Sequence, residues 1–209
     1  MRVNFIILFV LLIASCNKKE FSCKCDKSEI SKNDSLLDLP SRRIERNLFL
    51  KIFNQPHLKD LNCESYRLSI HIIGANESWF YTFKKQSRQS KLLIQKFSRI
   101  EGGYKKDMSR VEFFKSLKYK LDSERSIIFK GTEWEDFKNL VNRNCFWTTS
   151  IIEDKYGGLD GATYILEGYQ PNVENCSGKV YHEVSRWSPN SSDFGMICKK
   201  ILTYADRNN

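Results

Sequence analysis

The stretch YRLSIHI, residues 66–72, alternates polar and apolar side chains along its length. Successive side chains of a β-strand point to opposite faces of a sheet, so this alternation predicts a strand. Residues 74–77 (GANE) predict a turn, and residues 79–85 and 91–100 predict the next two strands. This part of the chain is therefore expected to form an antiparallel sheet.

Three other segments place apolar residues at the spacing of an amphipathic helix. The first covers residues 41–55 and begins with a serine that is a candidate N-cap. The second begins at Thr132, which forms the pattern of a capping box with Glu135, and it ends near Cys145. The third begins at Ser192.

Four further segments complete the expected fold. Residues 109–121 are ambiguous and compatible with a helix, whereas residues 126–130 have the composition of a strand. Residues 164–168 and 179–187 predict two strands of a hairpin with a long loop between them. The predicted class is α+β, with helices packed on one face of an antiparallel sheet in a single domain.

The first sixteen residues read MRVNFIILFVLLIASC. Arg2 precedes the apolar residues 5–13, a run that is too short for a membrane-spanning helix of roughly 20 residues but typical of a signal peptide. The sequence LIASC, residues 12–16, resembles the lipobox of bacterial lipoproteins. The resemblance implies cleavage before Cys16, a diacylglyceryl group on its thiol and, in many bacteria, acylation of the new N-terminus by a fatty acid such as palmitate. The alternative is an ordinary secretory peptide with an unrelated cysteine.

The residues after Cys16 are polar and charged, and they contain too few apolar side chains to offset the entropy of folding. The expected organisation is a lipoprotein signal peptide at 1–15, a lipidated cysteine and flexible tether at 16–40, and one α+β domain at 41–209. Because Asn17 follows the cysteine in place of an aspartate, a common inner-membrane retention signal is missing. The expected location is the cell envelope, with the outer membrane favoured over the inner membrane.

The remaining cysteines favour disulfides over a metal site. An exported protein meets an oxidising compartment, and four cysteines lie in the expected domain, so two disulfides among them are expected, with the pairing left open. These four are Cys63, Cys145, Cys176 and Cys198. The chain has no C-x-x-C motif and its three histidines are scattered, so neither a metal nor another cofactor is expected.

Positive charge is concentrated in residues 84–120, which hold twelve Lys and Arg against three Asp and Glu. Such a surface on a membrane-tethered protein suits phospholipid headgroups, lipopolysaccharide phosphates or an acidic protein partner. Nucleic acid is disfavoured as a partner because the chain is expected to leave the cytoplasm. The alternative is a solvated face that contributes only solubility.

The stretch KVYHEVSRWSP, residues 179–189, concentrates chemically capable side chains. On a strand His182 and Arg186 share one face, whereas Glu183 and Trp187 share the other. Asp160 lies in a glycine-rich turn expected to fall near Arg186. The candidate binding residues are Asp160, Glu167, His182, Arg186 and Trp187. One interpretation is a structural Asp160–Arg186 pair with His182 packed among apolar neighbours, and the other is a cleft for an anionic or sugar-like ligand.

Residues 132–204 contain the pattern FW…GGLDG…ILEG…YH-V-RWSP, which resembles a domain recurring in uncharacterised bacterial envelope proteins. This resemblance implies no particular activity, and the chain contains no G-x-S-x-G, P-loop, dinucleotide or H-E-x-x-H motif. The sequence therefore favours a non-enzymatic lipoprotein that binds or inhibits another component, as an immunity protein does. The alternative is an envelope hydrolase that acts on a glycan or lipid through Asp160, Glu167 and His182.

Overall fold

The computed structural model describes residues 40–72, 75–103, 105–151, 161–172, 178, 180–189 and 192–208. The predicted signal peptide, Cys16 and the predicted tether up to residue 39 lie outside these residues, as do Asp160 and Cys176.

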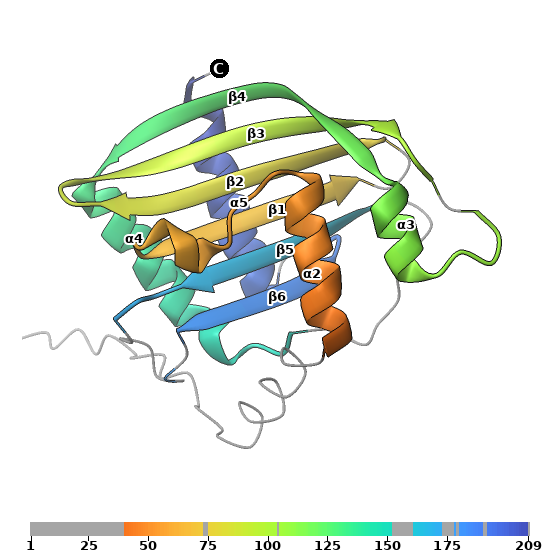
Figure 1. Cartoon of the computed structure of the whole chain (residues 1–209). Helices are drawn as coiled ribbons and strands as arrows, with labels where there is room; N and C mark the ends of the chain where they lie inside the picture. Colours follow the sequence, from red (N-terminus) through yellow and green to blue (C-terminus); the bar gives the residue numbers. More distant parts are fainter. Residues whose placement is uncertain are drawn as a thin grey trace, which may run out of the picture.

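Six antiparallel strands form one sheet in the order β4-β3-β2-β1-β5-β6 (Figure 1). The strands are β1 (Ser65–Ile72), β2 (Glu77–Gln86), β3 (Gln89–Glu101), β4 (Lys118–Lys130), β5 (Ala162–Tyr169) and β6 (Tyr181–Trp187). The predicted α+β class with an antiparallel sheet is confirmed. The predicted hairpin also forms, because β5 and β6 pair along their length.

One face of the sheet packs against α4 (Gly131–Arg143) and α5 (Asp193–Ala205), which lie behind it in Figure 1. The core here is strongly aromatic. The ring of Phe83 lies 4.9 Å from that of Trp134, 5.1 Å from that of Phe137 and 5.8 Å from that of Tyr204, measured between centroids. Aromatic pairs at these separations stabilise a core beyond the area that they bury.

The other face of the sheet is covered by α2 (Pro40–Ile52), which lies in front of the sheet in Figure 1, and by the 3₁₀ segment η1 (Leu58–Leu61). Phe53 forms a second core with Phe80 and Phe97. The prediction that the helices pack on one face is therefore wrong for α2. As a result β1 is buried on both sides from Ser65 to Ile70.

Helix α3 (Arg110–Ser116) lies beside α2 and precedes β4. Its N-cap Ser109 accepts a hydrogen bond from the backbone N–H of Glu112 at 3.3 Å, and its own backbone N–H donates to the Glu112 carboxylate at 2.9 Å. The ambiguous residues 109–121 thus divide into a short helix and the start of a strand. Two further 3₁₀ segments are η2 (Phe146–Thr148) and η3 (Asp206–Asn208).

The start of α4 differs from the prediction. The backbone N–H of Lys130 donates to the Glu133 carboxylate at 3.1 Å, so the helix begins at Gly131 and not at Thr132. Glu135, the expected partner in the capping box, lies 3.5 Å from the amino group of Lys85 on β2. The predicted start of the last helix is confirmed, because the Ser192 hydroxyl accepts from the backbone N–H at position 195 at 3.1 Å.

Candidate functional site

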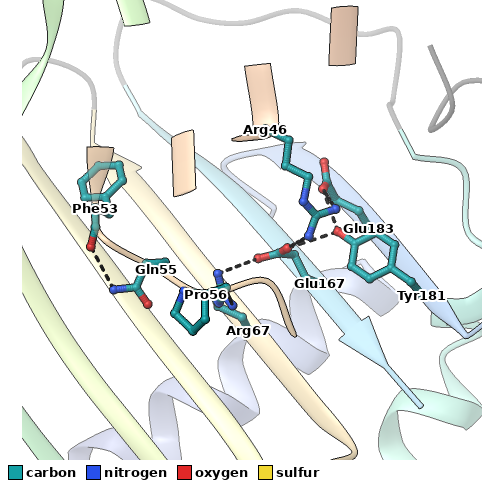
Figure 2. Close-up of polar contacts among 8 residues, drawn as sticks. All are labelled: Arg46, Phe53, Gln55, Pro56, Arg67, Glu167, Tyr181 and Glu183. Atoms are coloured by element: carbon teal, nitrogen blue, oxygen red, sulfur yellow. Dashed lines mark hydrogen bonds and ion pairs between the residues drawn. The ribbon is translucent and has the colours of Figure 1, made fainter. Parts of the chain in front are cut away.

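Five side chains form a charged cluster between α2 and the sheet, which we call the arginine–glutamate cluster (Figure 2). Its members are Arg46, Arg67, Glu167, Tyr181 and Glu183.

Strand register brings these residues together from distant parts of the sequence. Arg67 on β1 lies opposite Glu167 on β5, and Glu167 lies opposite Glu183 on β6. Tyr181 precedes Glu183 by two positions and therefore shares its face. Arg46 reaches the same place from α2 above this face of the sheet (Figure 2). The cluster thus fastens α2 to the β5–β6 half of the sheet.

Arg46 is the donor that joins the two carboxylates. Its guanidinium donates to Glu183 at 3.1 Å and also to Glu167. It lies 4.1 Å from the centroid of the Tyr181 ring, within the range of a cation–π interaction. The Tyr181 hydroxyl lies 3.1 Å from a Glu167 oxygen and 3.0 Å from a Glu183 oxygen. Because it has a single proton, it donates a hydrogen bond to one of the two carboxylates at a time.

Arg67 is a fully buried member of the cluster. It donates to the carbonyl oxygen of Pro56 at 2.6 Å, and its Nη1 lies 3.6 Å from a Glu167 oxygen. Burial lowers the pKa of Arg67, an effect that the Glu167 carboxylate opposes and the Arg46 charge reinforces. Isolating such a charge from water is costly unless a counter-ion lies nearby. Glu167, itself buried, is therefore the central residue of the cluster.

The two arginines and two glutamates carry balancing formal charges. Each arginine lies beside a carboxylate of the cluster, so no positive charge is left over to bind an external anion. The cluster is therefore better suited to holding α2 on the sheet.

The structure separates the residues that the hydrolase hypothesis would bring together. Glu167 belongs to the α2 face, whereas His182 lies on the face that packs against α4 and α5. Their side chains point to opposite sides of the sheet and do not share a site. Asp160, the third member of that group, lies outside the described residues.

His182 packs among aromatic side chains, as its structural interpretation predicts. It is fully buried, and its ring centroid lies 5.1 Å from that of Phe146 and 6.4 Å from that of Trp147. Its Nε2 lies 2.9 Å from the carbonyl oxygen of Thr149, to which it donates. Its register partner Gly168 leaves space for this packing, because a Cβ there would lie 2.6 Å from the Phe146 ring.

Arg186 and Trp187 lie on opposite faces of β6, as the alternation predicts. The Arg186 guanidinium donates to the carbonyl oxygens of Ser150 at 2.7 Å and Ile151 at 3.3 Å, which fixes the segment after η2 against the strand. The Asp160–Arg186 pair stays a prediction, since Asp160 is outside the described part of the chain. Trp187 is partly buried.

Sequence reasoning missed Arg46, Arg67, Tyr181 and Glu183 as members of a site. The alternation in residues 66–72 places Arg67 and His71 on the face that was expected to be free of helices. The first helical segment contains evidence against this expectation, because its Phe49 and Phe53 side chains require apolar partners on the sheet. They find them on the same face as Arg67 and so cover it.

Cys63 and Cys198 are free thiols, so the structure does not place either of them in a disulfide. Burial raises the pKa of both. Cys145 is disulfide-bonded, and the pairing that the sequence leaves open stays open, because Cys176 is not described. Among the residues that are described, no cluster of three or more His, Cys, Asp or Glu could hold a metal ion. In the same part of the chain, no helix has the length and apolarity needed to span a bilayer.

Comparison of the chain with protein-family models, curated proteins and solved structures found no significant match.

Proposed function

We propose that the protein is a lipid-anchored, non-enzymatic binding protein of the bacterial cell envelope, attached to the outer membrane through Cys16, and that its basic surface binds an anionic envelope component. The observation that carries this proposal is that eight of the twelve Lys and Arg side chains in residues 84–120 have no carboxylate of the described residues within 4.0 Å.

The residues of this basic surface belong to the end of β2, the whole of β3, the helix α3 and the beginning of β4. Four of its twelve cations lie within 4.0 Å of a carboxylate, in the pairs Lys85–Glu135, Lys96–Glu77, Arg110–Glu45 and Lys118–Glu101. The other eight have no such partner among the described residues. They are Lys84, Arg88, Lys91, Arg99, Lys105, Lys106, Lys115 and Lys120.

Uncompensated cations attract an anionic membrane surface by about 1 kcal/mol each when they lie close to it. This attraction decays over a Debye length of about 8 Å at physiological salt, so it acts only on a partner close to the protein surface. A lipid anchor would keep the domain near such a partner. The basic surface and the predicted anchor therefore support the same working location.

The anchor can be tested by replacing Cys16 with serine, which removes the thiol that the lipid requires. We expect the variant to move from the membrane fraction to the soluble fraction when cells are lysed and fractionated, because several acyl chains are needed for stable attachment. Cys63→Ser is the matched control, since it removes a free thiol elsewhere and should leave the protein in the membrane fraction. Retention of the Cys16→Ser variant in the pellet would contradict lipid anchoring.

The basic surface can be tested with Lys84 and Lys91, which lie opposite each other on β2 and β3. Neutralising either by substitution with glutamine should weaken binding to phosphatidylglycerol vesicles by about fivefold. Cosedimentation at low and high salt measures the effect. Lys59→Gln, on η1 and outside the basic surface, is the control. Equal binding of all variants would show that the basic surface is only a solvated face.

A further inference from the structure

A groove lies where α2 and α3 meet the ends of β3 and β4, with a volume of about 420 Å³. This volume falls in the range of about 300–1,000 Å³ that is typical of small-molecule sites. In the part of the chain that the structure describes, its lining combines an apolar floor with lysines and contains no acidic residue. The apolar and aromatic members are Leu48, Ile52, Ile100, Phe114, Leu117 and Tyr119, and the basic members are Lys51, Lys115 and Lys118.

Two of these lysines have no carboxylate partner among the described residues. Lys118 pairs with Glu101 at 2.5 Å, but Lys51 and Lys115 have no carboxylate within 4.0 Å among the described residues. Both lie in the last turn of a helix, where a cation interacts favourably with the helix dipole. The helix dipole does not explain the apolar floor of the groove, whose member Ile100 is 59 % exposed. An exposed apolar side chain in a concave basic site indicates a ligand with both properties.

We propose that this groove binds a single anionic glycerophospholipid from the membrane surface, with its phosphate at the lysines and its first methylene groups over the apolar floor. Lysine suits this role, because its ammonium is a compact charge with three donors that can turn toward phosphate oxygens. The inference rests on the proposed function, which brings the domain close to a lipid surface, and it assigns one discrete lipid site within the wider basic surface.

The test uses a lipid that is soluble as a monomer, so that attraction to a vesicle surface does not contribute. We expect isothermal titration of the full chain carrying Cys16→Ser with dihexanoyl phosphatidylglycerol to show one saturable site. Dihexanoyl phosphatidylcholine, which has a zwitterionic headgroup, should bind at least tenfold more weakly.

Matched variants separate the groove from the rest of the basic surface. Ile100→Ser, which leaves the net charge unchanged, and the double variant Lys51→Gln with Lys115→Gln should each weaken monomer binding at least fivefold. The double variant Lys84→Gln with Lys91→Gln loses the same charge outside the groove and should bind the monomer within twofold of the parent. Circular dichroism of each variant verifies that the fold is retained.

Absence of saturable monomer binding, equal binding of both lipids, or insensitivity to the groove variants would overturn the lipid site. Such a result, combined with unchanged binding to anionic vesicles, would refute the groove alone and leave the basic surface in place. If the parent protein binds neither the anionic vesicles nor the soluble anionic lipid, both proposals are refuted.

Discussion

Replacement of Glu167 by glutamine should lower the free energy of unfolding by about 3–5 kcal/mol, the usual cost of breaking a buried ion pair from one side. The glutamine preserves the size of the side chain but removes its charge, and its amide NH2 cannot accept the hydrogen bonds that a carboxylate oxygen accepts from Arg46 and Tyr181. Arg67 would then remain fully buried without its counter-ion, 3.6 Å from a neutral amide. Urea denaturation followed by fluorescence of the buried tryptophans measures the change.

Glu183→Gln provides the matched control for this experiment. Its side chain is 18 % exposed and shares Arg46 with Glu167, so its replacement should cost only about 1 kcal/mol. A second variant, Arg67→Met combined with Glu167→Leu, removes both buried charges and should regain most of the stability that the single change loses. Equal losses for Glu167→Gln and Glu183→Gln would contradict the central place of Glu167 in the cluster.

Acidification should destabilise the protein through His71, whose pKa is lowered by burial to about 4. The ring packs against Phe49 at 4.7 Å between centroids, and its Nδ1 lies 2.9 Å from the Ser78 hydroxyl. Between the ordinary pKa of about 6.5 and the lowered value, the unfolded chain binds a proton that the folded protein does not. The stability is therefore fully present above pH 6.5 and decreases as the pH falls toward 4, by about 1.4 kcal/mol per unit and about 3 kcal/mol in all.

The substitution His71→Gln isolates this contribution, because glutamine retains a hydrogen-bonding partner for Ser78 and does not titrate. Urea denaturation from pH 7.5 to pH 4.5 should show a shallower decline for the variant than for the parent. His57→Gln is the control and should retain most of the decline, since it leaves His71 in place. Parallel pH profiles for the parent and His71→Gln would exclude His71 as the source.

Local sequence patterns were sufficient for the elements whose signal lies within a few residues. The alternation of residues 66–72 and the cap at Ser192 both correspond to observed elements. The long strand β4 was predicted only over residues 126–130, because its first part is charged and exposed at the edge of the sheet. Composition cannot distinguish such a strand from a helix or loop, since its hydrogen bonds to β3 are what define it.

The charged cluster could not be predicted, because it depends on pairing between distant strands. Arg67 and Glu167 are one hundred positions apart in the chain, and only the β1–β5 register makes them neighbours. Arg46 adds a third segment through the packing of α2. By contrast, the separation of His182 from Glu183 was predictable, since alternation along one strand places adjacent residues on opposite faces.

The position of α2 also has a mechanical consequence. This helix is the first described element after the region that contains Cys16, so in an anchored protein any pulling force from the bilayer reaches the sheet through it. The ion pairs of Arg46 and the aromatic contacts of Phe49 and Phe53 would carry that load together. Their rupture would peel α2 away and expose the second core, while the larger aromatic core behind the sheet would remain intact.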